Sequence, residues 1–210
     1  MSILLNKDTN ILVQGITGSE GLFHAEQMIE YGSKVVCGVT PGKGGQKATT
    51  KSLPVFNSIE DAKKELQIDA TVIFVPPRFA AKAIIEAIQE KIQLIVCISE
   101  GIPTRDMVTV KNMLDKSSST LIGPNCPGLI TAEESKIGIT PGFICKKGSI
   151  GILSRSGTLT YEAIDQVVNV GLGITTAVGI GGDPVIGSSM IDILKHFQQD
   201  EDTKGIVLIG

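Results

Sequence analysis

The sequence contains few of the residues that build sites for polyanions or membranes. Tryptophan is absent, aromatic residues make up 4% of the 210 residues, and the net charge is −3 with no run of Lys or Arg. Nucleic-acid-binding proteins usually carry a basic face and aromatic residues for base stacking, so we expect no nucleic-acid partner. No apolar run has the length of a transmembrane helix, and the start, MSILLNKDTN, lacks the apolar segment of a signal peptide. These absences predict a cytoplasmic protein that is not embedded in a membrane.

Histidine and cysteine are also scarce. The four cysteines are widely spaced without a Cys-x-x-Cys pair, and there are only two histidines, so the sequence predicts no metal site. Cys37 and Cys97 lie in apolar runs and are expected in the core. Cys126 follows a strand-like run in GPNCPG and could line a pocket, but no histidine is paired with it in the sequence. We therefore do not expect it to be a nucleophile.

Short runs rich in Ile and Val alternate with longer amphipathic segments in the first 125 residues. The strand-like runs cover residues 11–15, 34–39, 70–76, 94–99 and 120–124. The helical segments cover roughly residues 19–31, 61–66, 79–89 and 105–114. Nearly continuous apolar runs are typical of parallel strands buried on both faces, and this alternation favours an α/β fold. We expect a Rossmann-like domain with a parallel sheet over residues 1–125.

A second series follows a stretch rich in turn residues. Residues 126–148 contain several Gly and Pro and are interpreted as a linker. Strand-like runs then recur at SIGILS, ITTAVGIG and GIVLIG, with helical segments at 158–169 and 188–197 between them. Residues 149–210 therefore form a second domain. Because its last apolar strand belongs inside a sheet, we expect these residues to be the N-terminal part of that domain in a longer chain.

The turn in QGITGSEG predicts a phosphate site. Gly15, Gly18 and Gly21 join a strand to a helix, an arrangement that directs backbone N–H groups and a helix N-terminus at one spot. The spacing is not the Gly-x-Gly-x-x-Gly of dinucleotide binders, and the acid expected after the second strand is replaced by Lys43 and Lys47 in TPGKGGQK. A ligand with a phosphate on its ribose is favoured over NAD. NADP and coenzyme A (CoA) both qualify.

A second turn, SRSGTLTYEA, has the same order of strand, turn and helix. Its Ser and Thr hydroxyls fit either a phosphate site or ordinary helix capping. One helix N-terminus stabilises an anion by about 0.3–2 kcal/mol, too little to hold a labile phosphoryl group alone. We expect a second helix N-terminus, from another chain, to complement it.

The motifs GITGSEG, GVTPGKGG, SEGIP, GPNCPG and SRSGTLTYEA…GIGGDP resemble, in order and over all 210 residues, the alpha subunits of succinyl-CoA synthetase (succinate–CoA ligase). ATP-citrate lyase belongs to the same wider family, but the short start and compact length favour the bacterial ligase subunit. The resemblance implies a CoA-binding Rossmann domain followed by a flavodoxin-like ligase domain. It also implies a beta subunit that binds ATP or GTP with Mg, and formation of succinyl-CoA from succinate and CoA.

The resemblance also implies roles for individual residues. The phosphohistidine of the family lies in a Gly-His-Ala-Gly context past Gly210, so neither His24 nor His196 matches it and no catalytic residue is expected here. The positions expected to contact CoA are Thr17, Gly18, Ser19, Glu20, Lys43, Ile98, Ser99 and Glu100. Those expected at the phosphate and the carboxylate substrate are Ser154, Ser156, Gly157, Thr158 and Tyr161.

Two other classes of protein stay open at this point. One is a CoA-binding sensor or regulator without catalysis, against which the second domain with its Ser-rich turn argues. The other is an NADP-dependent oxidoreductase, which the glycine spacing disfavours.

Overall fold

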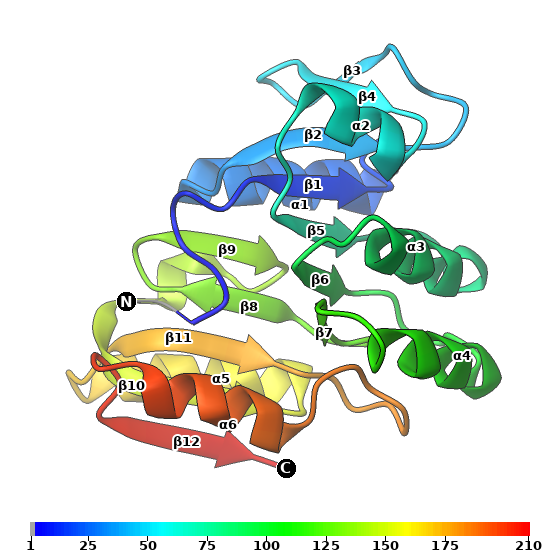
Figure 1. Cartoon of the computed structure of the whole chain (residues 1–210). Coiled ribbons are helices and arrows are strands. Elements are labelled where there is room, and N and C mark those ends of the chain that lie inside the picture. Colours follow the sequence, from blue (N-terminus) through cyan, green and yellow to red (C-terminus); the bar gives the residue numbers. More distant parts are fainter. Residues whose placement is uncertain (1–2) are drawn as a thin grey trace.

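The structure, a computed structural model that describes residues 3–210, contains a seven-stranded and a five-stranded β-sheet (Figure 1). The first sheet consists of β1 (Ile11–Gln14), β2 (Val35–Val39), β3 (Lys47–Ala48), β4 (Leu53–Phe56), β5 (Ala70–Ile73), β6 (Leu94–Cys97) and β7 (Thr120–Ile122). Its helices are α1 (Ser19–Tyr31), α2 (Ile59–Glu65), α3 (Pro77–Gln89) and α4 (Thr104–Leu114).

The strand order of the first sheet is β3-β4-β2-β1-β5-β6-β7. Strands β4, β2, β1, β5, β6 and β7 are parallel and follow the order of a doubly wound Rossmann sheet. The chain reverses direction across the sheet between β1 and β5. In such sheets ligands bind outside the carboxyl ends of the strands at this switch point. The glycine turn after β1 lies there.

The sheet differs from the expected parallel one at its edge. The segment TPGKGGQK leads into β3, which pairs antiparallel with β4. Both strands are short, and Pro54 within β4 gives a poor strand signal in the sequence. The fold class is nevertheless the predicted one, an α/β fold with mostly parallel strands.

The second sheet has the order β12-β10-β11-β8-β9. Its strands are β8 (Gly128–Thr131), β9 (Ser135–Gly138), β10 (Lys147–Ser154), β11 (Ile174–Gly179) and β12 (Gly205–Ile209), with helices α5 (Gly157–Asn169) and α6 (Met190–Gln199) and a 3-10 turn, η1 (Gly142–Ile144). Strand β10 pairs in parallel with both β11 and β12, which is the flavodoxin-like order for three successive strands. The turn after β10 therefore also lies at a switch point.

Residues 126–148, interpreted from the sequence as a linker, contain β8 and β9. These strands pair antiparallel with each other, β8 pairs with β11, and both are buried. The glycines in this segment allow the backbones of the two strands to lie close together. A Cβ on Gly128 would lie 2.1 Å from the carbonyl oxygen of Ile137. The segment thus belongs to the second sheet. Domain boundaries at 125 and 148 stay a prediction.

One cluster of the hydrophobic core is shared by the two sheets. One cluster of buried side chains combines Val13 of β1, Met28 of α1, Leu129 of β8 and Phe197 of α6. A second lies between the first sheet and α2, α3 and α4, and a third lies beneath α5. Because the first cluster crosses between the sheets, the two units are held together by apolar burial. No helix in residues 3–210 is long and apolar enough to span a membrane.

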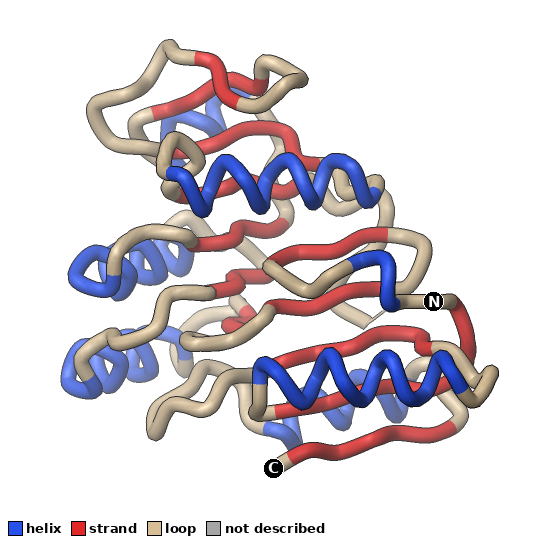
Figure 2. Tube along the Cα trace, turned by 180° about the vertical axis from the view of Figure 1, so that it is seen from behind, coloured by secondary structure: helices blue, strands red, loops and turns tan. Residues whose placement is uncertain are grey.

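Helix α1 joins the two units directly (Figure 2). At its carboxyl end the buried Ser33 hydroxyl accepts from the N–H of Lys136 on β9 and donates to the carbonyl of the same residue, both at 2.8 Å. The Tyr31 hydroxyl accepts from the N–H of Glu133 at 2.9 Å. The end of α1 is therefore fixed to the β8–β9 hairpin.

We predict that Ser33→Ala destabilises the protein. The substitution leaves two buried backbone groups of Lys136 without their partner, a loss of about 1–3 kcal/mol per unsatisfied group. Thermal denaturation followed by circular dichroism measures the effect, expected as a drop of roughly 2–4 °C in Tm per kcal/mol. The control is Ser118→Ala, at an exposed serine with no side-chain hydrogen bond among the described residues. Equal melting temperatures for the two variants would contradict the prediction.

Candidate functional site

The glycine turn after β1 allows close packing of backbone against backbone. Gly15 has φ +83°, which favours glycine, and its N–H donates to the carbonyl of Val39 at 2.8 Å. A Cβ on Gly21 would lie 2.2 Å from the carbonyl oxygen of Gly15. Only glycine at position 21 therefore lets α1 start directly against the turn.

The N-terminus of α1 is open to a ligand. Gly18 is the N-cap residue and makes no side-chain cap. Within residues 3–210 no group accepts a hydrogen bond from the N–H of Ser19, Glu20 or Gly21. Unpaired N–H groups at a helix N-terminus can bind phosphate, and the phosphate site expected from the sequence at this turn stays a prediction.

A cavity of about 590 Å³ opens on one side of this helix start. Its walls are mainly apolar and come from the ends of β2 and β5 and from α3: Val39, Pro41, Phe74, Val75, Pro76 and Phe79. Gln14 closes the inner end, where its amide donates to the carbonyl of Ala83 at 3.3 Å. We call this the first cavity.

The first cavity contains a cation that the sequence motifs did not indicate. Lys82 lies on α3 three residues after Phe79, so both side chains are on one face of the helix and both line the cavity. The three-residue spacing of Phe79 and Lys82 was the feature of the sequence that could have indicated that Lys82 lines this cavity. Thr17 also lines it, with its hydroxyl donating to Thr40 at 3.2 Å.

A second cavity of about 450 Å³ lies on the other side of Gly18. It is lined by residues of the helix start, of the strand ends and of the segment after β9: Ser19, Glu20, His24, Ile98, Ser99 and Ile139. The two cavities share Gly18, Phe74, Val75 and Pro76. Together they form one groove that crosses the N-terminus of α1.

The groove brings together six of the eight residues expected to contact CoA. Thr17 lines the first cavity, Gly18 lines both, and Ser19, Glu20, Ile98 and Ser99 line the second. Lys43 and Glu100 are exposed and line neither cavity. Lys43 lies in a loop held by Asn57, whose side-chain oxygen accepts from the N–H groups of Gly42 and Gly44, both at 2.9 Å.

His24 lies between two aromatic rings at the second cavity. Its ring stacks on Phe74, with centroids 5.3 Å apart, and meets the edge of Phe23 at 5.0 Å. Burial lowers the pKa of His24, the Glu20 carboxylate opposes this shift, and the charge of Lys136 adds to it. The side chain is therefore neutral at pH 7.

The two ring nitrogens of His24 differ. Nδ1 is buried without a hydrogen-bond partner among the described residues, whereas Nε2 lies 3.7 Å from a carboxylate oxygen of Glu20. The negative charge of Glu20 favours a proton on the nitrogen that faces it. We assign the ring proton to Nε2, next to Glu20.

The second turn, after β10, is tied together by its own side chains. The Ser154 hydroxyl is fully buried; it donates to the carbonyl of Ser156 at 2.9 Å and accepts from its N–H at 3.0 Å. Ser156 caps α5 by accepting from the N–H of Leu159 at 3.3 Å. Gly157 has open space at its Cβ position. Serine capping, one of the two interpretations of this turn, is thus present.

Tyr161 follows one turn later on α5 and is half-buried. Burial raises the pKa of its hydroxyl to about 12, so this hydroxyl stays protonated and can donate a hydrogen bond. Thr158 is exposed at the start of the same helix. The four residues expected at the phosphate therefore lie within one turn at the start of α5.

Arg155 connects this turn to the loop after β11. Its guanidinium donates to the carbonyls of Gly181 and Gly182 at 3.4 Å and of Asp183 at 3.0 Å. The Asp183 carboxylate accepts from the side-chain amide of Asn125, at the end of the first sheet, at 2.9 Å. The motif GIGGDP thus fixes the second turn relative to the first unit.

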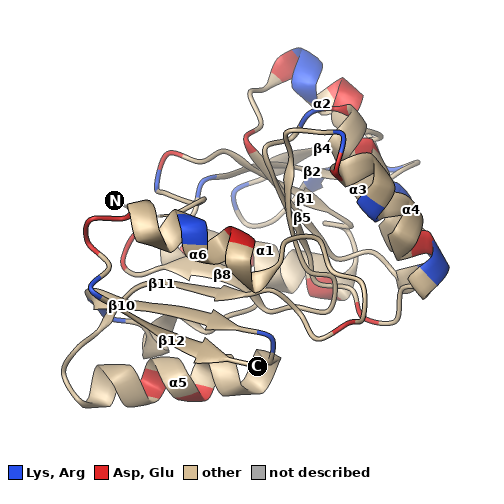
Figure 3. Cartoon of the chain, turned by 60° about the horizontal axis from the view of Figure 1, so that its bottom comes forward, with Lys and Arg blue, Asp and Glu red and all other residues tan. Residues whose placement is uncertain are grey.

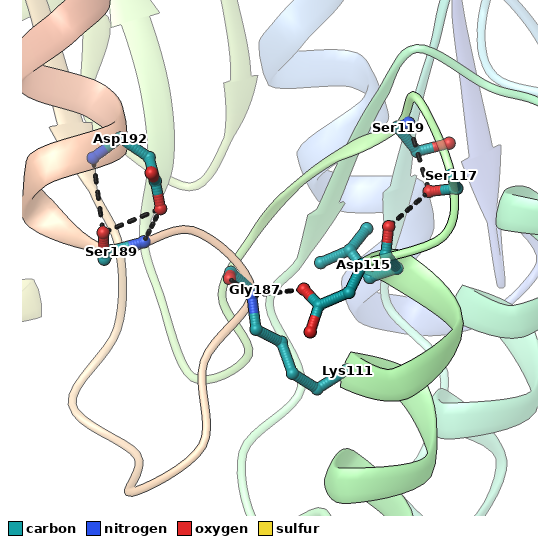
Figure 4. Close-up of polar contacts among 8 residues, drawn as sticks. Lys111, Asp115, Ser117, Ser119, Gly187, Ser189 and Asp192 are labelled. Atoms are coloured by element: carbon teal, nitrogen blue, oxygen red, sulfur yellow. Dashed lines mark hydrogen bonds and ion pairs between the residues drawn. The ribbon is translucent and has the colours of Figure 1, made fainter.

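Farther along the same loop, Lys111 of α4 donates to the carbonyl of Gly187 at 2.9 Å and pairs with Asp115 at 3.0 Å (Figure 4). In the same view Ser189 and Asp192 form the capping box that starts α6. The loop from β11 to α6 is therefore attached at both of its ends.

The remaining polar and reactive groups give no second chemical centre. Cys37, Cys97 and Cys126 are buried, as expected for the first two, and burial raises the pKa of the Cys126 thiol. Within residues 3–210 no group of three or more His, Cys, Asp and Glu side chains could hold a metal ion.

Acidic and basic side chains are interspersed on α2, α3 and α4 (Figure 3).

Comparison with known proteins agrees with this geometry. Residues 6–101 match the family model of the CoA binding domain, and residues 153–210 match that of CoA-ligase. The chain is 55% identical over all its 210 residues to the alpha subunit of the ADP-forming succinate–CoA ligase of Staphylococcus aureus, and 54% identical to that of Staphylococcus epidermidis. It spans 69% of the length of these relatives.

Solved structures share the fold. ATP citrate lyase from Methanothrix soehngenii, in complex with citrate and coenzyme A, superimposes with a TM-score of 0.89 at 26% identity, covering 99% of this chain and 37% of that one. A dinucleotide-forming acetyl-coenzyme A synthetase from Ca. Korarchaeum cryptofilum has a TM-score of 0.79 at 19% identity over 96% of this chain and 43% of its own.

The fold and the groove define a CoA-binding unit joined to part of a CoA-ligase unit. The chain belongs to the family of succinate–CoA ligase alpha subunits. The resemblance inferred from the motifs is thereby confirmed, and the NADP-dependent oxidoreductase and the stand-alone sensor are not favoured.

We predict that Gly21→Ala destabilises the protein and weakens ligand binding at the groove. The added methyl overlaps backbone of the glycine turn, and such overpacking costs about 1–3 kcal/mol, more than the roughly 0.5–1 kcal/mol that Ala gains over Gly in a helix. The matched control is Gly157→Ala, also at the start of a helix but with open space at its Cβ position. Thermal melting of both variants checks the prediction, which is wrong if Gly21→Ala melts no lower than Gly157→Ala.

Proposed function

We propose that this chain binds CoA along the groove, with the diphosphate at the N-terminus of α1. The observation that carries the proposal is the pair of cavities on either side of an uncapped helix start. A ligand that fills both needs a central anion and two arms. CoA has this shape, because its diphosphate joins the adenosine to the pantetheine arm.

The two cavities suit different arms. In Rossmann folds the ribose lies beside the end of the second strand, which here is β2 with Thr40 and Pro41 at the first cavity. The apolar walls of that cavity fit a flat adenine ring. We therefore place the adenosine in the first cavity and the pantetheine arm in the second, which leads toward the second unit.

Two lysines are candidates for the phosphate on the ribose. Lys82 lines the first cavity, and Lys43 lies in the exposed loop that follows β2. We propose that at least one of them pairs with this phosphate when CoA is bound. The other positions expected to contact CoA provide no cation: Thr17, Gly18, Ser19, Glu20, Ile98, Ser99 and Glu100.

The reaction proposed for the complete enzyme is that of the family: succinate, CoA and ATP or GTP give succinyl-CoA, nucleoside diphosphate and phosphate. A carboxylate is a poor acyl donor because its oxygen leaves badly. Phosphorylation through a phosphohistidine gives an acyl phosphate, and attack of the CoA thiol on its carbonyl then releases phosphate and forms the thioester. Division into covalent steps lowers each barrier.

We assign the start of α5 to the phosphate in this scheme. Gly157 leaves space beside the helix N-terminus, and Tyr161 provides a protonated hydroxyl one turn away for the succinate carboxylate. One helix N-terminus contributes about 0.3–2 kcal/mol, so we propose that a beta subunit adds a second and also binds the nucleotide with Mg. A cytoplasmic location is part of the same proposal.

We predict that calorimetry on the chain shows binding of CoA, with weaker binding of dephospho-CoA. Lys82→Ala and Lys43→Ala test the source of the difference: the lysine that pairs with the ribose phosphate, once removed, reduces the preference for CoA. Lys116→Ala, at an exposed lysine in the turn after α4, is the control. Equal affinity of the parent chain for CoA and dephospho-CoA would exclude a role for either lysine, and no binding of CoA would exclude the proposed function.

We also predict that neither His24 nor His196 is phosphorylated. His24 is held between Phe23 and Phe74 in the other unit, and His196 lies in the last turn of α6, where a cation suits the helix C-terminus. The chain is incubated with labelled ATP, Mg and a beta subunit, and acid-labile phosphate is mapped by mass spectrometry. Label on either histidine would overturn the assignment of both to structural or binding roles.

A further inference from the structure

In the second cavity the ring of His24 has a hydrogen-bonding capacity that no group in residues 3–210 uses. The Ser99 hydroxyl already donates to the carbonyl of Val75 at 2.5 Å. Glu20 offers only carboxylate oxygens, and its side chain is 77% exposed. His24 lines the cavity, and the 3.7 Å between its Nε2 and Glu20 is too long for a hydrogen bond. Its N–H is therefore available to a ligand.

The orientation of the ring is fixed before any ligand binds. Phe74 covers one face of the ring at an interplanar angle of 10°, and Phe23 meets it edge-on at 76°. Nδ1 is buried, so the 16% exposure of the side chain belongs to the rest of the ring. A neutral donor held in this way lowers the entropic cost of forming one directed hydrogen bond.

The chemistry of the donor selects its acceptor. A phosphate oxygen is bound better by cations, such as Lys82 of the first cavity, and by the backbone N–H groups of the helix start than by one neutral ring N–H. A neutral N–H in a cavity with apolar walls suits a carbonyl oxygen. Among the parts of CoA, only the pantetheine arm carries carbonyl groups on amides.

We propose that His24 positions the pantetheine arm of CoA in the second cavity, with its Nε2–H donating to an amide carbonyl of that arm. This inference rests on the proposed binding of CoA. It makes His24 a positioning residue, which directs the arm past Ile98 and Ser99 toward the second unit, and assigns it no proton transfer. His24 lies on α1 after the last glycine of the motif, so the motif alone does not indicate this role.

Two variants that replace the imidazole by a side-chain amide test the contact. The side-chain amide of His24→Gln reaches the place of Nε2, whereas that of His24→Asn reaches only the place of Nδ1. We expect His24→Asn to bind CoA roughly 2- to 12-fold more weakly than the parent chain, the range for one neutral hydrogen bond, and His24→Gln to bind nearly as well as the parent. Affinities are measured by calorimetry.

The second ligand is 3′-phosphoadenosine 5′-diphosphate, which is CoA without the pantetheine arm. Its affinity is expected to be the same for the parent chain and both variants. If both variants lose affinity for the two ligands equally, His24 only supports the glycine turn and the inference is wrong. It is also wrong if both variants bind CoA like the parent, or if Asn retains affinity and Gln does not. Failure of the parent chain to bind CoA would instead contradict the proposed function.

A measurement on the unmodified chain covers the case in which a variant does not fold. The protein has only two histidines, so ¹⁵N-histidine labelling gives one signal set for His24 and one for His196. CoA is expected to shift the Nε2 resonance of His24, and 3′-phosphoadenosine 5′-diphosphate to leave it in place. His196, in α6, serves as the internal control. An Nε2 resonance that CoA leaves unchanged would overturn the inference.

Discussion

The close contact between Gly15 and Gly21 is the constraint on which the candidate site depends. It places the first turn of α1 against the end of β1, and both cavities are defined by that helix start. At the other end of α1, Ser33 is bonded to Lys136 of β9. The helix that carries the candidate anion site therefore also connects the two units. Contacts at both of its ends fix the direction of its N-terminus.

The same coupling fixes the second turn relative to the groove. Arg155 binds three carbonyls of the loop after β11, Asn125 binds Asp183 in that loop, and Lys111 binds Gly187 farther along. A shared hydrophobic cluster lies beneath these polar contacts. In the proposed reaction the CoA thiol attacks an activated acyl group, and the two candidate sites for these groups are thus carried on one packed body. The entropic cost of bringing the two sites together is then met in folding rather than during the reaction.

Much of this could be predicted from the sequence because it depends on local patterns. Buried parallel strands give continuous apolar runs, and the strand–glycine–helix order identified both turns. The six groove residues were expected from the family resemblance of the motifs. The β8–β9 hairpin was missed because its glycines, which allow close contact between strands, resemble those of a linker. Lys82 and His24 were missed for another reason: each lies on a helix beyond the glycine motif. The spacing of Lys82 from Phe79 was a weak signal, and for His24 the contact with Phe74 in the folded chain shows that it lines a cavity.

The N-termini of α1 and α5 differ in how many backbone N–H groups they leave for an anion. The start of α1 has no side-chain cap, so its N–H groups are free for the proposed ligand, which the two cavities would contact along its length. The start of α5 is capped by Ser156, which satisfies the N–H of Leu159 and leaves fewer donors for an anion. A capped terminus binds phosphate more weakly and releases it more readily. Weak binding suits the proposed phosphoryl group, which has to leave again, and it is the reason why the proposed scheme includes a complementary charge from a partner subunit.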